Sequence, residues 1–286
     1  LNEPIGRSCI IPDTESRYVV AVDNVVLRPN ANYNKKFIMY GMNADGYAEH
    51  ANMIARGATM SRISRSQLGQ FWLAFPNIEE QQAIADFLDK ECAQIDSIAA
   101  DLEKQIALLQ QYKKSLITET VTKGLDKSVP MKDSGVEWIG KIPAHWKAKR
   151  LKYVMNNFDA QRKAIEAQNR SQDGEILYDY YGASGAIDKI DDYNVDDEVL
   201  LIGEDGANLR MRNLPLVYKA KGKFWVNNHA HILKVKDSNL YDYMAYVLEA
   251  GDYSNYITGS AQPKLSQFNL MRFPIPIAPI NEQFKI

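Results

Sequence analysis

A long stretch without proline or glycine constrains the fold of this chain more than any other feature of its sequence. The stretch runs from Ile78 to about Val121, and Gly124 follows it as a residue type that commonly ends a helix. Asn77 is a suitable N-cap, and the glutamates that come soon after it suit the positive end of a helix dipole. The sequence therefore predicts one helix of roughly 65 Å, at about 1.5 Å per residue.

Apolar side chains recur along this helix with a period of seven residues. Such a seam is typical of a coiled coil, because it is too narrow to be buried by the helix alone and needs a partner helix. An ordinary long core helix is the alternative interpretation. The predicted seam comprises Leu88, Ile95, Ile98, Leu102, Leu109, Tyr112 and Leu116.

An internal repeat is the second informative feature. When the sequence is shifted by 202 positions, 28 residues align without a gap and eight of them are identical, including Gly57 with Gly259 and Gln81 with Gln283. Chance similarity between two loop-to-helix junctions is the alternative. A true repeat would supply a partner for the long helix, but the second copy of that helix only begins before the sequence stops at Ile286.

Runs typical of short strands and a short helix accompany the long helix, so the predicted fold class is α+β, with small mixed α/β domains joined by a long coiled-coil helix. Short β-like runs are expected at residues 18–27, 198–202, 216–218, 224–226 and 231–235, with a short helix at 239–249. The expected organisation is the C-terminal part of a first domain (1–77), the spacer helix (78–123), a linker (124–132), a second domain (133–277) and the start of a second spacer helix (278–286).

Composition limits the function only weakly. The formal net charge is -2, from 34 basic and 36 acidic residues, which counts against a free-standing nucleic-acid binder but not against one subunit of a larger complex. The two cysteines, Cys9 and Cys92, lie far apart and make no disulfide framework, so we expect a cytoplasmic location. No apolar run approaches the ~20 residues of a membrane span.

Charge is sharply divided in the second half of the chain. Residues 206–236 hold seven basic side chains and no acidic one, whereas residues 188–205 hold eight acids and one lysine. Arginine and asparagine are suited to reading base edges, and lysine to contacting phosphates. A solvated charged surface is the alternative.

Loops with glycine, tyrosine and amide residues add further candidates. Tyr180 and Tyr181 precede a glycine turn and would either contact nucleic acid or pack within a strand. Arg62 and Lys264 occupy matching positions in the two repeat copies. The predicted nucleic-acid contacts are Arg62, Tyr180, Tyr181, Ser184, Asp205, Asn208, Arg210, Arg212, Lys221, Asn227, Asn228, His229 and Lys264.

Signatures of catalysis are mostly missing from the sequence. We find no phosphate-binding GxxxxGK[ST] loop, no GxGxxG after a strand and no convincing nuclease set of carboxylates and lysine. His229 and His231 would share one face of a strand, but no third ligand of matching type lies near them in sequence, so no metal site is predicted.

Several linked motifs together resemble a known family, the specificity subunits of type I restriction–modification systems. The motifs are the DSGVEWIG segment from Asp133 with the following Pro and Trp residues, YGASG from Tyr181, GEDGA from Gly203 and WVNNHAH from Trp225. The twice-used Glu-Gln start of a helix belongs to the same set. The resemblance covers nearly the whole chain, and the set is far more specific than any one motif.

The resemblance implies a binding scaffold without an active site. Such subunits carry two target recognition domains that each read half of a split DNA target, and two paired helices set the gap between the halves. Modification subunits bind S-adenosylmethionine and methylate adenine, while restriction subunits use ATP and Mg²⁺. No cofactor is then expected in this chain, and its expected partners are double-stranded DNA and these two kinds of subunit.

The chain departs from the family pattern at both ends. The first domain lacks a counterpart of the segment at Asp133, and the second spacer helix stops at Ile286, so we expect a truncated copy. Two other functions stay open: an enzyme that carries the recognition domain as an appendage, and an assembly protein that occupies modification subunits and reads one half-site or none.

Overall fold

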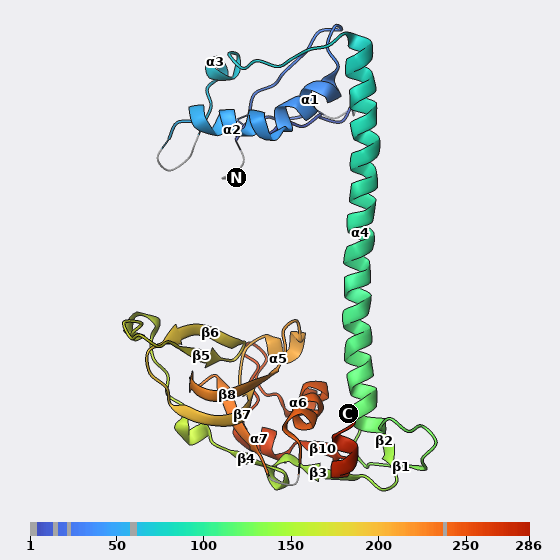
Figure 1. Cartoon of the computed structure of the whole chain (residues 1–286), viewed down its shortest axis with the longest axis vertical. Coiled ribbons are helices and arrows are strands. Elements are labelled where there is room, and N and C mark those ends of the chain that lie inside the picture. Colours follow the sequence, from blue (N-terminus) through green and yellow to red (C-terminus); the bar gives the residue numbers. More distant parts are fainter. Residues whose placement is uncertain (1–4, 14–16, 22–23, 58–61, 237–238) are drawn as a thin grey trace. The chain divides into compact units, whose positions relative to one another are not determined.

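The long helix predicted from the sequence is confirmed as α4, Ile78–Lys123, with 46 residues. This computed structural model describes residues 5–13, 17–21, 24–57, 62–236 and 239–286. The chain divides into two units, Leu1–Ile106 and Ala107–Ile286, and α4 contributes to both (Figure 1).

Local signals at both ends of α4 act as the sequence suggests. The side-chain Oδ1 of Asn77 accepts a hydrogen bond from the backbone N–H of Glu80 at 2.9 Å, which is an N-cap. At the other end Gly124 has a φ of +74°, a left-handed conformation that favours glycine. The helix bounds are therefore set by residues immediately outside the periodic stretch.

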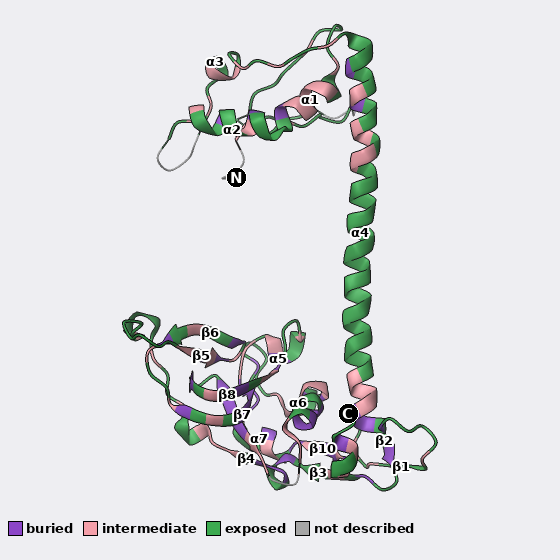
Figure 2. Cartoon of the chain, in the orientation of Figure 1, coloured by how far each residue is buried: buried purple, intermediate pink, exposed green. Residues whose placement is uncertain are grey.

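The predicted seam of α4 is largely exposed within this chain. Figure 2 shows the middle of the helix as exposed, and Leu109 and Tyr112 keep 65% and 64% of their surface. Burial is confined to the two ends of the helix: Gln81 and Ala85 are buried in the first unit, and Val121 packs with Trp146 in the core of the second unit. The pairing of this seam with another helix stays a prediction.

The first unit contains three short helices and the N-terminal part of α4. The helices are α1 (Lys35–Asn43), α2 (Asp45–Ile54) and α3 (Arg65–Leu68). Its small core consists of Met42, Tyr47 and Ala51. Tyr40 ties α1 to α4, because its hydroxyl donates to Asp89 at 2.8 Å.

The strand expected at residues 18–27 is not formed in the part of it that the structure describes. Residues 17–21 and 24–27 have no regular secondary structure, and Val19 is 98% exposed. A strand is stabilised by pairing and by burial of one face, and this segment has neither. Residues 22–23 lie outside the described residues.

A mixed six-stranded sheet forms the centre of the second unit, in the order β4-β9-β7-β8-β5-β6. Only β5 and β8 are parallel; the other neighbours are antiparallel. The strands are β4 (Met155–Asn157), β5 (Tyr178–Gly182), β6 (Gly185–Ile190), β7 (Val195–Gly203), β8 (Val217–Val226) and β9 (Ala230–Val235). The α+β fold class predicted from the sequence is confirmed.

Both faces of the central strand β7 are buried. Leu200 and Ile202 face one core, which contains Val247 and Leu248 of α6, Tyr241–Ala250. Leu201 faces a second core on the other side of the sheet. Alternate side chains of a strand point to opposite faces, so this strand is held from both sides and is a rigid support for the loops that leave it.

A clasp of short strands closes the second unit beside the end of α4. The clasp strands are β1 (Met131–Asp133), β2 (Lys141–Pro143), β3 (Lys147–Arg150) and β10 (Pro274–Ile277), with β1 paired to β2 and β3 paired to β10. Trp146 is fully buried, and its indole N–H donates to Glu282 at 2.9 Å. The tryptophan-rich segment thus joins the start and the end of the unit.

The remaining elements of the second unit are short helices. They are η1 (Leu151–Tyr153), η2 (Asp159–Gln161), η3 (Ala167–Asn169), α5 (Asn208–Met211), η4 (Ser254–Tyr256), α7 (Gln267–Arg272) and α8 (Ile280–Gln283).

The two repeat copies have the same local structure before their helices. The backbone of Arg56 pairs with that of Arg62 in the first unit, and the backbone of Thr258 pairs with that of Lys264 in the second. Two residues later, Ser266 caps α7 through the N–H of Asn269 as its repeat counterpart caps α3. The pairs are 202 positions apart, so the shift found in the sequence corresponds to a repeated fold.

A buried glutamine completes this repeated junction. The side chain of Gln81 donates to the carbonyl of Pro76 at 2.8 Å and accepts from the N–H of Asn34, the N-cap of α1, at 2.9 Å. Gln283 donates to the carbonyl of Ala278 at 2.7 Å and accepts from the N–H of Leu240, the N-cap of α6, at 2.8 Å. In each unit one amide therefore fixes the start of a helix to the domain before it.

Candidate nucleic-acid interface

Four turns of the second unit meet at the end of β7, and together they form what we call the loop cluster. It comprises the β5–β6 turn at residues 183–184, the end of β7 at 204–205, the β8–β9 turn at 227–229 and a strap at 258–265. The backbone N–H of Glu204 donates to His229 at 2.8 Å, and the N–H of Leu265 donates to Glu204 at 2.7 Å. The N–H of Asn227 donates to Tyr181 at 3.0 Å. Backbone hydrogen bonds thus fix three of the turns to one another and Asn227 to the end of β5.

Gly203 allows the fourth turn of the cluster, the β5–β6 turn, to lie close to β7. A Cβ at Gly203 would lie 2.7 Å from the carbonyl oxygen of Ala183, a distance that real side chains do not reach. The β5–β6 turn therefore lies directly against the backbone of β7 because residue 203 has no side chain. The motif around Gly203 therefore serves this close packing.

The strap is a closed loop held down on the cluster. Thr258 and Lys264 exchange two backbone hydrogen bonds of 2.8 Å, and Gly259 has a φ of +81° inside the loop. The N–H of Gly206 donates to Pro263 at 3.1 Å, and an Nη2 of Arg210 donates to the carbonyl of Gly259 at 3.1 Å. Hydrogen bonds within the strap and to the residues after β7 thus hold the strap in place.

Seven of the residues predicted from the sequence lie in or against this cluster. Asn227 is buried, and its Oδ1 accepts from the N–H of His229 at 2.8 Å, so it shapes the turn. The side chain of His229 is about half exposed. The seven are Ser184, Asp205, Arg210, Asn227, Asn228, His229 and Lys264.

Tyr180 lies elsewhere, in the core. It is 1% exposed, and its hydroxyl bonds to the backbone of Ile165, accepting from the N–H at 3.0 Å. Tyr181 packs edge-on against Phe224 with ring centroids 5.6 Å apart. Of the two interpretations that the sequence left open, strand packing therefore describes the ring of Tyr180.

Two further predicted contacts serve the local structure. Arg212, with a φ of +53°, donates to the backbone carbonyls of Glu249 and Gly251 at the end of α6, so it is a helix-end ligand and not a free base reader. Asn208 donates to the carbonyls of Leu214 and Pro215 and closes a loop.

The last two predicted contacts lie away from the cluster. Lys221 is on β8 and pairs with Glu198 at 3.5 Å. Arg62 belongs to the first unit, and the residues just before it, 58–61, lie outside the described residues.

A buried polar network supports the cluster, and sequence reasoning missed it. Glu204 accepts from Arg162, and its other oxygen lies 3.0 Å from the ammonium of Lys264. His231 is fully buried: its Nδ1 lies 2.6 Å from Asp159 and its Nε2 lies 2.7 Å from the carbonyl oxygen of Leu265. A carbonyl oxygen only accepts, so Nε2 donates and ties the strap to β9.

Two carboxylates of this network are held in their ionised form. Burial acts to raise the pKa of Glu204, but hydrogen bonds from Arg162 and Lys264 outweigh it and lower the pKa below its ordinary value. Burial acts in the same direction on Asp159, and the hydrogen bond and charge of His231 outweigh it, so the pKa of Asp159 is also lowered. The network is thus a set of opposite charges under the strap.

The exposed groups of the cluster suit recognition. Asn228 offers an amide, His229 an imidazole and Lys264 a cation, all on turns fixed by backbone hydrogen bonds. Arg210, on α5, offers a second cation against the strap. Such groups bind phosphates and base edges. Within the described part of the chain, no three His, Cys, Asp or Glu side chains group as metal ligands do. No helix in that part is both long and apolar enough to cross a membrane.

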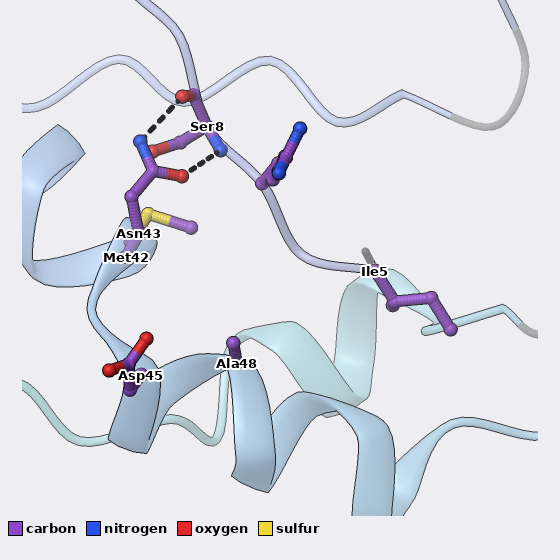
Figure 3. Close-up of a pocket in the computed structure, with 7 residues that line it drawn as sticks. Ile5, Ser8, Met42, Asn43, Asp45 and Ala48 are labelled. Atoms are coloured by element: carbon purple, nitrogen blue, oxygen red, sulfur yellow. Dashed lines mark hydrogen bonds between the residues drawn. The ribbon is translucent and has the colours of Figure 1, made fainter. Parts of the chain in front are cut away.

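A hollow of about 440 Å³ lies in the first unit, between residues near the N-terminus and helices α1 and α2 (Figure 3). Ser8 and Asn43 exchange two hydrogen bonds across it, of 3.0 and 2.9 Å. Its rim has one cation, Arg7, and one carboxylate, Asp45. These groups of opposite charge do not favour one class of ligand.

Comparisons with known proteins agree on a single family. Residues 1–108 and 143–286 match the family described as "Type I restriction modification DNA specificity domain". The chain is 31% identical over 156 residues to a "Putative type I restriction enzyme specificity subunit S.HindORF215P" of Haemophilus influenzae, covering 54% of this chain. It is 23% identical over 296 residues to the "Putative type I restriction enzyme MjaX specificity subunit" of Methanocaldococcus jannaschii, covering 98% of this chain.

A solved structure of a type I R-M system, described as showing complex assembly and conformational transition, has a similar fold. Its TM-score is 0.60 at 14% identity, over 89% of this chain and 62% of that one. The present chain spans 37% and 66% of the lengths of the two relatives. Because the family match covers most of the sequence, the chain belongs to the family of type I restriction–modification DNA specificity domains.

Proposed function

We propose that this chain is the DNA sequence-reading subunit of a type I restriction–modification complex and performs no catalysis itself. The observation that carries the proposal is the loop cluster, where outward donors and acceptors stand on turns held by a rigid sheet. The family match supports the same function. Reading of DNA requires such groups in fixed positions, since base edges are distinguished by their pattern of donors and acceptors.

Within the cluster, we assign different tasks to different side chains. Lys264 and Arg210 contact phosphates, and Ser184, Asn228 and His229 face the base edges. Asp205 and Asn227 hold the turn. Arg62 has the corresponding phosphate-contacting task in the first unit, on the loop that matches the strap.

The assembly is proposed from the family and from the exposed helix. The partners are double-stranded DNA, modification subunits that bind S-adenosylmethionine, and restriction subunits that use ATP and Mg²⁺; none of these cofactors binds to this chain. Exposed sides of α4 contact the modification subunits, and its seam pairs with a second spacer helix. We retain the division into recognition domains at 1–77 and 133–277, the spacer at 78–123, the linker at 124–132 and a second spacer from 278.

An adenine-methylation map of cellular DNA tests the proposal, after co-expression of this chain with modification subunits. A split motif with a fixed unspecified gap is expected. A palindromic split motif would show instead that one domain reads DNA in a paired complex, which is the half-specificity alternative. A complex that forms but leaves no methylated motif would overturn the DNA-reading function and favour a role in assembly.

A substitution in the cluster links the motif to this site. Arg210→Ala should weaken DNA binding of the complex on all sequences alike, and Lys147→Ala, an exposed lysine on β3 in the clasp, is the matched control. Equal losses from both variants would place the DNA contact outside the loop cluster.

A further inference from the structure

Asp205 and His229 form a closely bonded pair in the outward part of the loop cluster. The Nδ1 of His229 lies 2.8 Å from one carboxylate oxygen of Asp205 and 3.0 Å from the other. The carboxylate is mostly shielded, with 17% of the side chain exposed, whereas 47% of the imidazole is exposed. The pair therefore presents one open edge of the ring to the outside.

The carboxylate fixes which ring nitrogen carries the hydrogen. A carboxylate only accepts, so Nδ1 must donate to it, and the neutral ring then has a lone pair at Nε2. Within the described part of the chain, Nε2 has no hydrogen-bond partner, whereas Nδ1 is bonded to Asp205. In the neutral ring, the free edge of His229 is thus an acceptor.

The backbone around the pair holds this acceptor in place. The N–H of His229 is bonded to Asn227, and its carbonyl accepts from Glu204 at 2.8 Å. The backbone of Asp205 pairs with Lys264 on the strap. Both partners of the dyad therefore stand on fixed backbone, and the carboxylate of Asp205 orients the ring.

We infer that His229 is a base-reading residue that accepts a hydrogen bond, through Nε2, from an exocyclic amino group in the major groove, and that Asp205 is its positioning residue. The inference rests on the proposed DNA-reading function. The major groove offers amino donors at adenine N6 and cytosine N4, whereas guanine and thymine present acceptors at the corresponding places. An acceptor held at one point therefore distinguishes adenine and cytosine from guanine and thymine on the contacted strand.

Motif mapping of variants in the complete complex tests the assignment. His229→Ala should make one position of one half-site degenerate and leave all other positions of the methylated motif unchanged. Asp205→Asn should relax the same position, because an asparagine amide can either accept from or donate to Nδ1 and no longer fixes the hydrogen. His145→Ala is the matched control, since His145 forms a similarly exposed 2.6 Å pair with Glu282 in the clasp; it should keep the whole motif.

Base analogues then test the atom. The base at the position relaxed by His229→Ala is replaced by an analogue without the amino group. The wild-type complex should bind this duplex about tenfold more weakly than the natural duplex. The alanine variant should bind both duplexes equally well. Removal of the ring nitrogen N7 of a purine at that position should have no such effect.

The outcomes separate this inference from the proposed function. A wild-type motif that is retained in full by His229→Ala would overturn the base-reading role but leave the DNA-reading function intact. A uniform loss over all positions would show that the pair only supports the turn. Equal sensitivity to loss of N7 would show that the ring reads a different atom.

Discussion

Glu204 and Lys264 form an ion pair of 3.0 Å that joins the end of the central strand β7 to the strap. Ten per cent of the Glu204 side chain is exposed, against 54% of the Lys264 side chain. The carboxylate therefore anchors the pair from the protein side, while the ammonium remains within reach of a ligand. The same carboxylate also binds Arg162, so two cations share it.

The pH dependence of the free energy of unfolding should show the contribution of the ionised Glu204 carboxylate. Its pKa is lowered in the folded protein from an ordinary value of 4.5, so its stabilisation is complete above that value and is lost as pH falls through the lower folded-state pKa. Glu204→Gln should therefore cost roughly 1–3 kcal/mol at neutral pH. The difference between variant and wild type should shrink steadily below about pH 4.

Urea unfolding followed by tryptophan fluorescence measures this difference in the second unit. Trp146 and Trp225 are buried there, whereas Trp72 of the first unit is already 96% exposed and contributes little change. A difference between Glu204→Gln and wild type that stays constant from pH 7 to pH 3 would contradict the ionised network.

Arg212 should matter for stability through the end of α6. Arg212→Ala removes the donors to the carbonyls of Glu249 and Gly251 and should destabilise the second unit by about 2–3 kcal/mol in the same urea experiment. Arg212→Gly loses the same bonds but suits the φ of +53°, so it should be about 1 kcal/mol more stable than the alanine variant. The opposite order of the two variants would refute the role of the backbone conformation.

The buried glutamine of each junction should protect a specific amide. Gln283→Ala leaves the N–H of Leu240 without its acceptor, and amide hydrogen exchange at the start of α6 should become faster. Gln81→Ala should have the same effect on Asn34 at the start of α1. Gln110→Ala, on the exposed middle of α4, should change neither; unchanged exchange in all three variants would mean that the junctions are held by other contacts.

The seam of α4 should act in association and not in the stability of the second unit. Leu109 is 65% exposed, so Leu109→Lys should leave the urea midpoint of that unit unchanged. It should reduce helix pairing in the assembled complex, which sedimentation velocity would detect as a lower mass. Gln110→Lys adds the same charge beside the seam; an equal loss of mass in that variant would show that charge, and not the seam, controls assembly.

Local signals explain which parts of the fold were predictable. Asn77 and Gly124 bound the long helix through interactions with their own neighbours, so the sequence indicates them directly. Strand β8 was expected as two runs, but it continues as one strand through Gly222 because its neighbour β7 pairs along its length. The length of β8 is thus decided by a strand distant in sequence. In the segment at residues 18–27, by contrast, β-favouring residues lack a pairing strand and form no strand in the part that the structure describes.

The candidate site was predictable for the turns but not for what lies under them. Glycine and asparagine around Gly203 and Asn227 indicate turns by their own conformational preferences. The sequence left both options open for Tyr180 and did not reveal the contacts of Arg212, because both depend on residues elsewhere in the chain. The contact between Asp159 and His231 joins positions 72 residues apart, and no periodic pattern in the sequence marks it.

The separation of the four turns along the chain has a consequence for inheritance. Residues 183–184, 204–205, 227–229 and 258–265 are joined in space by the sheet, while the segments between them carry the core. An exposed side chain of a turn, such as that of Ser184 or Asn228, can change without disturbing the core, whereas the buried Glu204 and Asn227 hold the turns together. Successive generations can therefore alter such a surface at its exposed positions, one at a time.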